Sequence, residues 1–222
     1  MLKIIDTFQD FLIFIDKTKS KKPNQKIDLF KSSYMFKYPE LFERIIFEYK
    51  KHNINLFSLL EKYFDLLEFD YFLDYIKEAR RNILNLSNKV YIKFINFFKM
   101  DFNLLFVIYF SIGFAAGWVT KYEDLPAILF GLEKIGELNW HKEEKVEGLM
   151  AHELSHLIHM NIRNEFEVFD ILEENPIFNI YSEGFAQRVS SIILNKLNLF
   201  IVDEVKEYID WYNKNHQFLK NE

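Results

Sequence analysis

The chain has 222 residues, half of them hydrophobic, and a formal net charge of −5 at pH 7. This length suits one domain with an ample apolar core, and the mildly acidic balance argues against a nucleic-acid partner. Because the sequence contains no cysteine, disulfides and thiolate–metal sites are excluded, and any metal must be held by histidine and carboxylate. The missing cysteines are typical of a reducing compartment, so we expect a cytoplasmic protein.

The sequence of residues 1–100 predicts a series of helices. The segment 2–15 has an apolar face at helical spacing, and the acidic residues Asp6 and Asp10 within it argue against a signal peptide. Residues 19–25 predict a loop, and Pro39 suits the first position of a helix. Further helices are predicted at 40–51, 55–67, 71–84 and 87–98. We expect residues 1–100 to pack on a core formed by residues 101–222, in one continuous domain.

The segment Phe102–Thr120 contains no charged residue and approaches the length of roughly 20 residues that a membrane helix needs. Aromatic and β-branched residues crowd its first half, however, and Gly113 and Gly117 interrupt its second half. This distribution of residue types favours a buried strand followed by a turn over a membrane span. Strands are therefore predicted at 104–112 and 127–130, with a turn-like segment between them, and Gly117 and Trp118 could border a cleft.

The rest of the chain again has helical spacing. A helix is predicted from about Glu143 to Met160, and residues 162–175 are polar and broken, ending in the turn signal Asn175–Pro176. Another helix is predicted over 181–197, with Ser182 as its N-cap, and a last one over 202–212. The whole pattern predicts a mainly helical α+β chain with a small sheet near the middle.

The sequence AHELSH, residues 151–156, contains the residues with the clearest chemical meaning. His152 and His156 are four residues apart, so on a helix both imidazoles share a face and can reach one metal ion. Glu153 lies about 100° around the helix from His152, where it can contact a metal-bound water instead of the metal. The motif thus predicts a metal site with a carboxylate beside it.

A third ligand is predicted in the sequence YSEGFAQRVSS, residues 181–191. Glu183 lies beside the small residues Gly184 and Ala186, which would allow this helix to approach the histidine-bearing one. A set of two histidines and one glutamate suits zinc and leaves its fourth position for water, as catalytic zinc sites do. The acidic residues with less favourable surroundings that remain as alternative third ligands are Glu165, Asp170, Glu173 and Glu174.

Two further residues near the motif each allow two interpretations. Tyr181 could donate a hydrogen bond to a developing oxyanion, or it could be a packing aromatic residue. His159 lies too far along the helix to share one tetrahedral ion with both motif histidines. It could line a cleft or cap the helix, or it could be an ordinary core or surface residue.

The succession of HELSH and SEGFA resembles the gluzincin class of zinc metallopeptidases. The order of AILFGLEKI (127–135), MAHELSHLIH (150–159) and EGFA (183–186) is similar to a bacterial family of predicted zinc-dependent proteases of unknown function. The resemblance covers about residues 100–195. It implies a zincin-like core in which His152, His156 and Glu183 hold Zn²⁺ and Glu153 is the general base for hydrolysis of a peptide or protein substrate. From the way gluzincins bind, we expect strand 104–112 or 127–130 to present its edge to that substrate.

The sequence also departs from related patterns. Met160 and Asn161 do not fit the metzincin motif, and Gln187 stands where thermolysin-like enzymes carry an acidic residue after the third ligand. The partner that orients the ligating histidine is therefore unassigned. Regulatory peptidases of the ImmA type are a rival interpretation. A non-catalytic metal-binding sensor or interaction module is a third.

Overall fold

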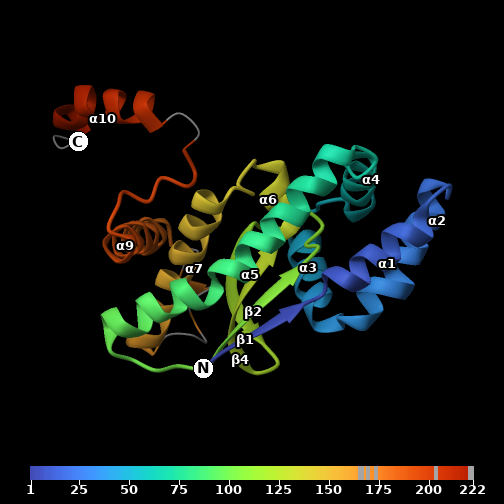
Figure 1. Cartoon of the computed structure of the whole chain (residues 1–222), viewed down its shortest axis with the longest axis horizontal. Coiled ribbons are helices and arrows are strands. Elements are labelled where there is room, and N and C mark those ends of the chain that lie inside the picture. The colour runs from blue at the N-terminus through green and yellow to red at the C-terminus, as the bar shows by residue number, and fades with distance from the viewer. Residues whose placement is uncertain (165–167, 169–170, 173–174, 203–204, 220–222) are drawn as a thin grey trace.

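A computed structural model describes residues 1–164, 168, 171–172, 175–202 and 205–219, and these form a mainly helical α+β fold around one mixed sheet. The strands of the sheet are β1 (Leu2–Asp6), β2 (Leu104–Tyr109), β3 (Gly117–Tyr122) and β4 (Leu125–Gly131). Their order is β1-β2-β4-β3, with β1, β2 and β4 parallel and β3 antiparallel to β4. Figure 1 shows the sheet at the centre of the molecule, with helices around it.

The helices precede, separate and follow these strands. They are α1 (Phe8–Thr18), α2 (Pro23–Leu29), α3 (Pro39–Lys51), α4 (Leu56–Leu66), α5 (Asp70–Phe98), α6 (Leu132–Glu137), α7 (Glu143–Arg163), α9 (Pro176–Leu194) and α10 (Val205–Leu219). A short π-helical turn and a 3₁₀ turn cover Phe30–Lys37. In Figure 1, α10 stands apart from the sheet, beyond α9.

Helices cover both faces of the sheet. Tyr109 and Thr120 project from the same face, where Phe42 of α3 contacts the Tyr109 ring and Arg44 of α3 donates a hydrogen bond to Thr120. Gly117 faces the opposite side, towards α7. Each face is therefore closed by a helical layer, and α7 lies directly against the edge strand β3.

The uncharged segment that raised the question of a membrane span is part of the core. All six residues of β2 are buried, as expected for a parallel strand with neighbours on both sides. In the part of the chain that the structure describes, no helix combines the length and the apolar character needed to cross a membrane. The prediction of a buried strand is confirmed, whereas the part of the segment predicted to be turn-like contains the start of β3.

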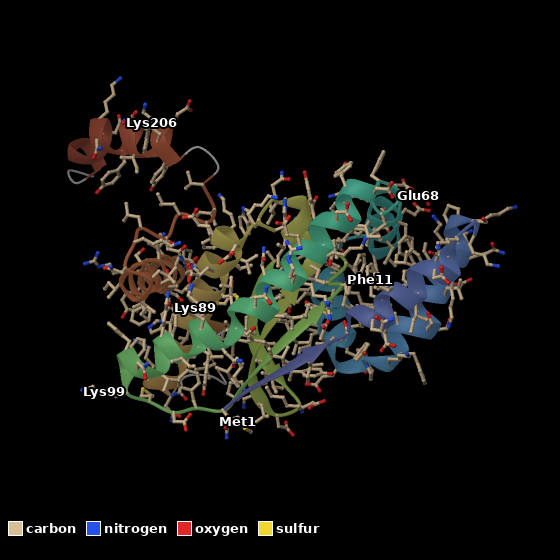
Figure 2. All side chains as sticks on the ribbon, viewed as in Figure 1. Met1, Phe11, Glu68, Lys89, Lys99 and Lys206 are labelled. Carbon is tan, nitrogen blue, oxygen red and sulfur yellow. The ribbon has the colours of Figure 1, made fainter. Side chains whose placement is uncertain are left out.

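Aromatic packing fills the space between the first helices and the end of β2. Phe11 of α1 lies within the dense layer of side chains in Figure 2 and stacks on Phe110, with the ring centroids 4.6 Å apart. Phe30 and Tyr34 are also fully buried in this layer. The abundance of phenylalanine and tyrosine in the sequence thus serves the core.

Two predicted elements in the first half of the chain are wrong. Residues 2–6, predicted as part of a helix, form β1, because pairing with the buried strand β2 outweighs their local helical spacing. The two helices predicted at 71–84 and 87–98 are one helix, α5. Ser87, the first residue of the second predicted helix, lies inside α5 and donates its hydroxyl to the Ile83 carbonyl one turn earlier at 2.6 Å.

The start signals of two other helices were also misinterpreted. Asn175 and Pro176, predicted as a turn, are the N-cap and first residue of α9, and the Asn175 side chain accepts from the backbone of residues 177 and 178. Ser182 is therefore in the middle of α9 and caps nothing. The predicted loop 19–25 likewise ends early, because α2 begins at Pro23.

The helices predicted at 40–51, 55–67 and 143–160 and the strand at 127–130 are confirmed. The strand predicted at 104–112 ends at Tyr109, and the last helix covers Val205–Leu219 instead of 202–212. The predicted break at 162–175 begins within α7 and lies partly outside the described residues. Pro39 begins α3, and Asn55 caps α4 by accepting from the backbone of residues 57 and 58. The motif helix, α7, extends from Glu143 to Arg163. The prediction that 104–112 or 127–130 is an edge strand is wrong, because β2 and β4 each have neighbours on both sides. The edge beside α7 is β3, within the segment predicted to be turn-like.

Candidate metal centre

Helix α7 carries the histidine motif through the interior of the molecule. Glu143 and Glu144 in the first turn of α7 interact favourably with the positive end of the helix dipole. The helix ends at Asn164, which adopts the left-handed conformation. Nearly every residue from 146 to 160 is buried, because the sheet, α5 and α9 all contact the helix. The two motif imidazoles are consequently held in a mostly apolar layer.

The two histidines and the predicted third ligand come together. The His152 and His156 Nε2 atoms are 3.1 Å apart, and they lie 3.2 and 3.4 Å from the Oε2 and Oε1 atoms of Glu183. Ligands at about 2.0–2.1 Å from a tetrahedral zinc ion would be about 3.3 Å apart. These ligand atoms therefore have the spacing that one ion requires, and the three residues form a possible metal site.

The electrostatics of the group also suit a cation. The Nε2 atoms of His152 and His156 both face the Glu183 carboxylate, and each can donate a hydrogen bond to a different one of its oxygens. Hydrogen bonds from His152 and His156 hold the pKa of the Glu183 carboxyl well below its ordinary value. Glu183 is half exposed, so an ionised carboxylate borders solvent where a metal ion could enter.

Glu153 lies beside this group without belonging to it. It lines a cavity of about 170 Å³ together with the three ligand residues and four others: Gly117, Trp118, Val119 and Met160. Burial raises the pKa of the Glu153 carboxyl, while the neighbouring charges of His152 and His156 oppose that shift. The arrangement therefore joins a possible cation site to a buried carboxylate of raised pKa. Gly117 and Trp118, predicted to border a cleft, do so.

Gly117 lets the Glu153 carboxylate lie against the edge strand. A Cβ atom at this position would be 2.5 Å from Glu153 Oε1 and 2.6 Å from Cδ, closer than real Cβ contacts come. Only glycine leaves room for this approach of side chain to backbone.

Each imidazole of the possible metal site has a different contact on its other side. Ser182 is fully buried, and its Oγ lies 3.1 Å from His156 Nδ1. The His152 ring packs on Phe200 with the centroids 5.3 Å apart, and among the described residues its Nδ1 has no hydrogen-bond partner. Sequence reasoning missed both partners. Ser182 could have been inferred from its position next to the predicted ligand Glu183, whereas nothing in the sequence pointed to Phe200.

The other predicted residues lie outside the cavity or outside the described structure. Tyr181 is half exposed, contacts the His159 ring at 5.3 Å between centroids and does not line the cavity, so its role as an oxyanion donor stays a prediction. His159 is buried and stacks on Phe185 of α9 at 4.5 Å, which places it in the packing between the two helices. The alternative third ligands Glu165, Asp170, Glu173 and Glu174 are outside the described residues.

Comparison with known proteins does not assign the chain to a family. No protein-family model, curated protein or solved structure matches the chain. The inference from the site therefore depends on its residues and their arrangement alone.

Proposed function

We propose that the protein is a zinc-dependent peptidase. The observation that carries this proposal is the convergence of His152, His156 and Glu183 beside a buried carboxylate, Glu153, that is left out of the ligand group. A purely structural zinc site would close all four positions with protein ligands, whereas three ligands leave one position for water. A cavity at this place is what a hydrolytic site needs.

Each residue then has a defined task. His152, His156 and Glu183 would hold zinc, which, when bound, polarises a carbonyl and makes its water more acidic. Glu153 accepts the proton of the attacking water and passes it to the leaving amine. Its raised pKa favours both transfers near neutral pH, because a base whose pKa lies closer to the working pH can also release the proton.

The edge strand β3 offers a binding surface for an extended peptide. The Ala116 carbonyl accepts a hydrogen bond from Gly131 N, so this carbonyl points towards β4. Backbone groups alternate in direction along an antiparallel ladder, and those of Gly117 and Val119 therefore point away from β4, on the side where no further strand is described. Both residues line the cavity. A substrate added as a strand here would pass beside Glu153.

The test compares the protein with a Glu153→Gln variant. Both are loaded with zinc and incubated with a mixed peptide library, and products are followed by mass spectrometry. We expect wild-type protein to cleave peptides and the variant to keep its zinc but lose turnover, because the amide cannot accept the proton. Zinc binding without cleavage by wild-type protein would favour a sensor or interaction module. Undiminished turnover by the variant would remove Glu153 from its role.

A further inference from the structure

A buried asparagine outside the metal site links the two helices that carry the ligands. Asn198 follows α9 and is only 2% exposed. Its side-chain Nδ2 donates to the Gly148 carbonyl of α7 and to Ser190 Oγ of α9, each at 2.9 Å. A single amide group thus bridges the histidine-bearing helix and the glutamate-bearing helix.

The backbone of Asn198 is fixed to α9 as well. Its N–H donates to Ser191 Oγ at 3.0 Å, and its carbonyl accepts from the side-chain amide of Gln187. These two bonds hold the backbone of Asn198 on α9, and the side chain extends from there to the Gly148 carbonyl of α7. Gln187 stands at the position where thermolysin-like enzymes carry an acidic residue. In this chain its side chain binds the Asn198 carbonyl.

Helix α7 is shaped to receive this contact. A Cβ atom at Gly148 would lie 2.4 Å from Asn198 Oδ1 and 2.6 Å from Phe200 Cβ, so glycine is needed for the segment 198–200 to approach. Phe200 then covers the His152 ring. The same short segment therefore contacts α7 both at Gly148 and at the ligand one turn later.

The position of the bridge along the helices relates it to the metal site. Gly148 is one helical turn before His152, and Gln187 is one turn after Glu183. We propose that Asn198 is a positioning residue that sets the separation of α7 and α9, and hence the distance from Glu183 to the two imidazoles. The inference rests on the proposed metal site. Because a metal ligand must lie within about 0.2 Å of its ideal distance, small movements of α9 should weaken binding.

The test is the zinc affinity of Asn198→Ala, measured by competition with a chromophoric chelator. Residues that orient ligands from outside the coordination sphere typically affect metal affinity by about 10–100-fold, and we expect a loss in that range. The visible spectrum of bound Co²⁺, which reports coordination geometry, should also change. Unchanged affinity and an unchanged spectrum in a folded variant would overturn the proposal.

The matched control is Asn82→Ala. Asn82 is also buried, and its Nδ2 donates to the His141 carbonyl at 2.8 Å, away from the ligands. This variant should lose thermal stability yet keep wild-type zinc affinity, and an equal loss of affinity in both variants would contradict a specific role for Asn198. If Asn198→Ala does not fold, Gln187→Ala replaces it, and wild-type affinity there would refute the proposal. Absence of zinc binding by wild-type protein would instead remove the metal site itself.

Discussion

Replacing Gly117 by alanine should impair catalysis while leaving the metal bound. The added Cβ would lie 2.5 Å from Glu153 Oε1, whereas ordinary contacts begin at 3.4 Å, so the carboxylate must move by about 0.9 Å. The ligands His152, His156 and Glu183 come from α7 and α9, and this substitution does not touch them. Position 117 therefore tests Glu153 separately from zinc binding.

The size of the effect follows from that displacement. Misplacing a catalytic group by about 1 Å can lower the rate about 100-fold, which corresponds to about 2.7 kcal/mol of activation free energy. Overpacking of this kind also lowers the free energy of unfolding by about 1–3 kcal/mol, and in a protein of this size each kcal/mol lowers Tm by about 2–4 °C. We thus expect a folded, somewhat less stable protein with a kcat reduced by about two orders of magnitude.

The assay measures kcat on the best peptide from the library digest, with zinc content and Tm measured in parallel. Gly184→Ala is the matched control, since Gly184 is next to the ligand Glu183 but has nothing within 4 Å of the added Cβ. The control should keep full activity and gain up to about 1 kcal/mol in stability from its better helix propensity. Full activity of Gly117→Ala would refute the placement of Glu153 against β3 as a catalytic requirement.

Two further predictions concern stability. Zinc should stabilise the native state by about 4.1 kcal/mol at a free concentration 1,000 times its Kd, and a Tm that does not respond to zinc would contradict metal binding by the folded chain. Burial raises the pKa of Glu137, but hydrogen bonds from Lys62, Tyr63 and Lys134 outweigh it and lower the pKa to about 2. A lowered native pKa adds stability above the unfolded value of 4.5, and this stability is lost as the pH falls towards 2. Glu137→Gln should therefore flatten the decline of the urea midpoint between about pH 4.5 and 2, and an unchanged slope would show that this carboxylate does not contribute.

The residues of the possible metal site could be predicted from the sequence because the geometry of its two histidines is local. The spacing of His152 and His156 fixes their common face as soon as the segment is helical. Glu183 was predicted from its small neighbours, of which only Ala186 is buried; Gly184 has nothing within 4 Å of an added Cβ, so its expected role in helix packing is wrong. The start of the helix was also placed too late. An error in the helix boundary does not change which residues share a face, and the prediction of Glu183 as a partner survived it.

The surroundings of the ligands could not be predicted because they depend on tertiary contacts. Ser182 reaches His156 across 26 residues of sequence, and Asn198 reaches Gly148 across 50. The strand β1 forms only because β2 is available to pair with it. The edge strand β3 begins with a glycine, contains the charged Lys121 and lies in a segment that ends in Pro126, and its pairing with β4 decides its conformation.

The central claim is tested most directly by the zinc stoichiometry of metal-free protein titrated with zinc, followed by elemental analysis after gel filtration. The proposed function predicts one tightly bound zinc per chain, lost when His156 or Glu183 is replaced by alanine. Wild-type protein that retains no zinc, or variants that retain it fully, would contradict the assignment of this site.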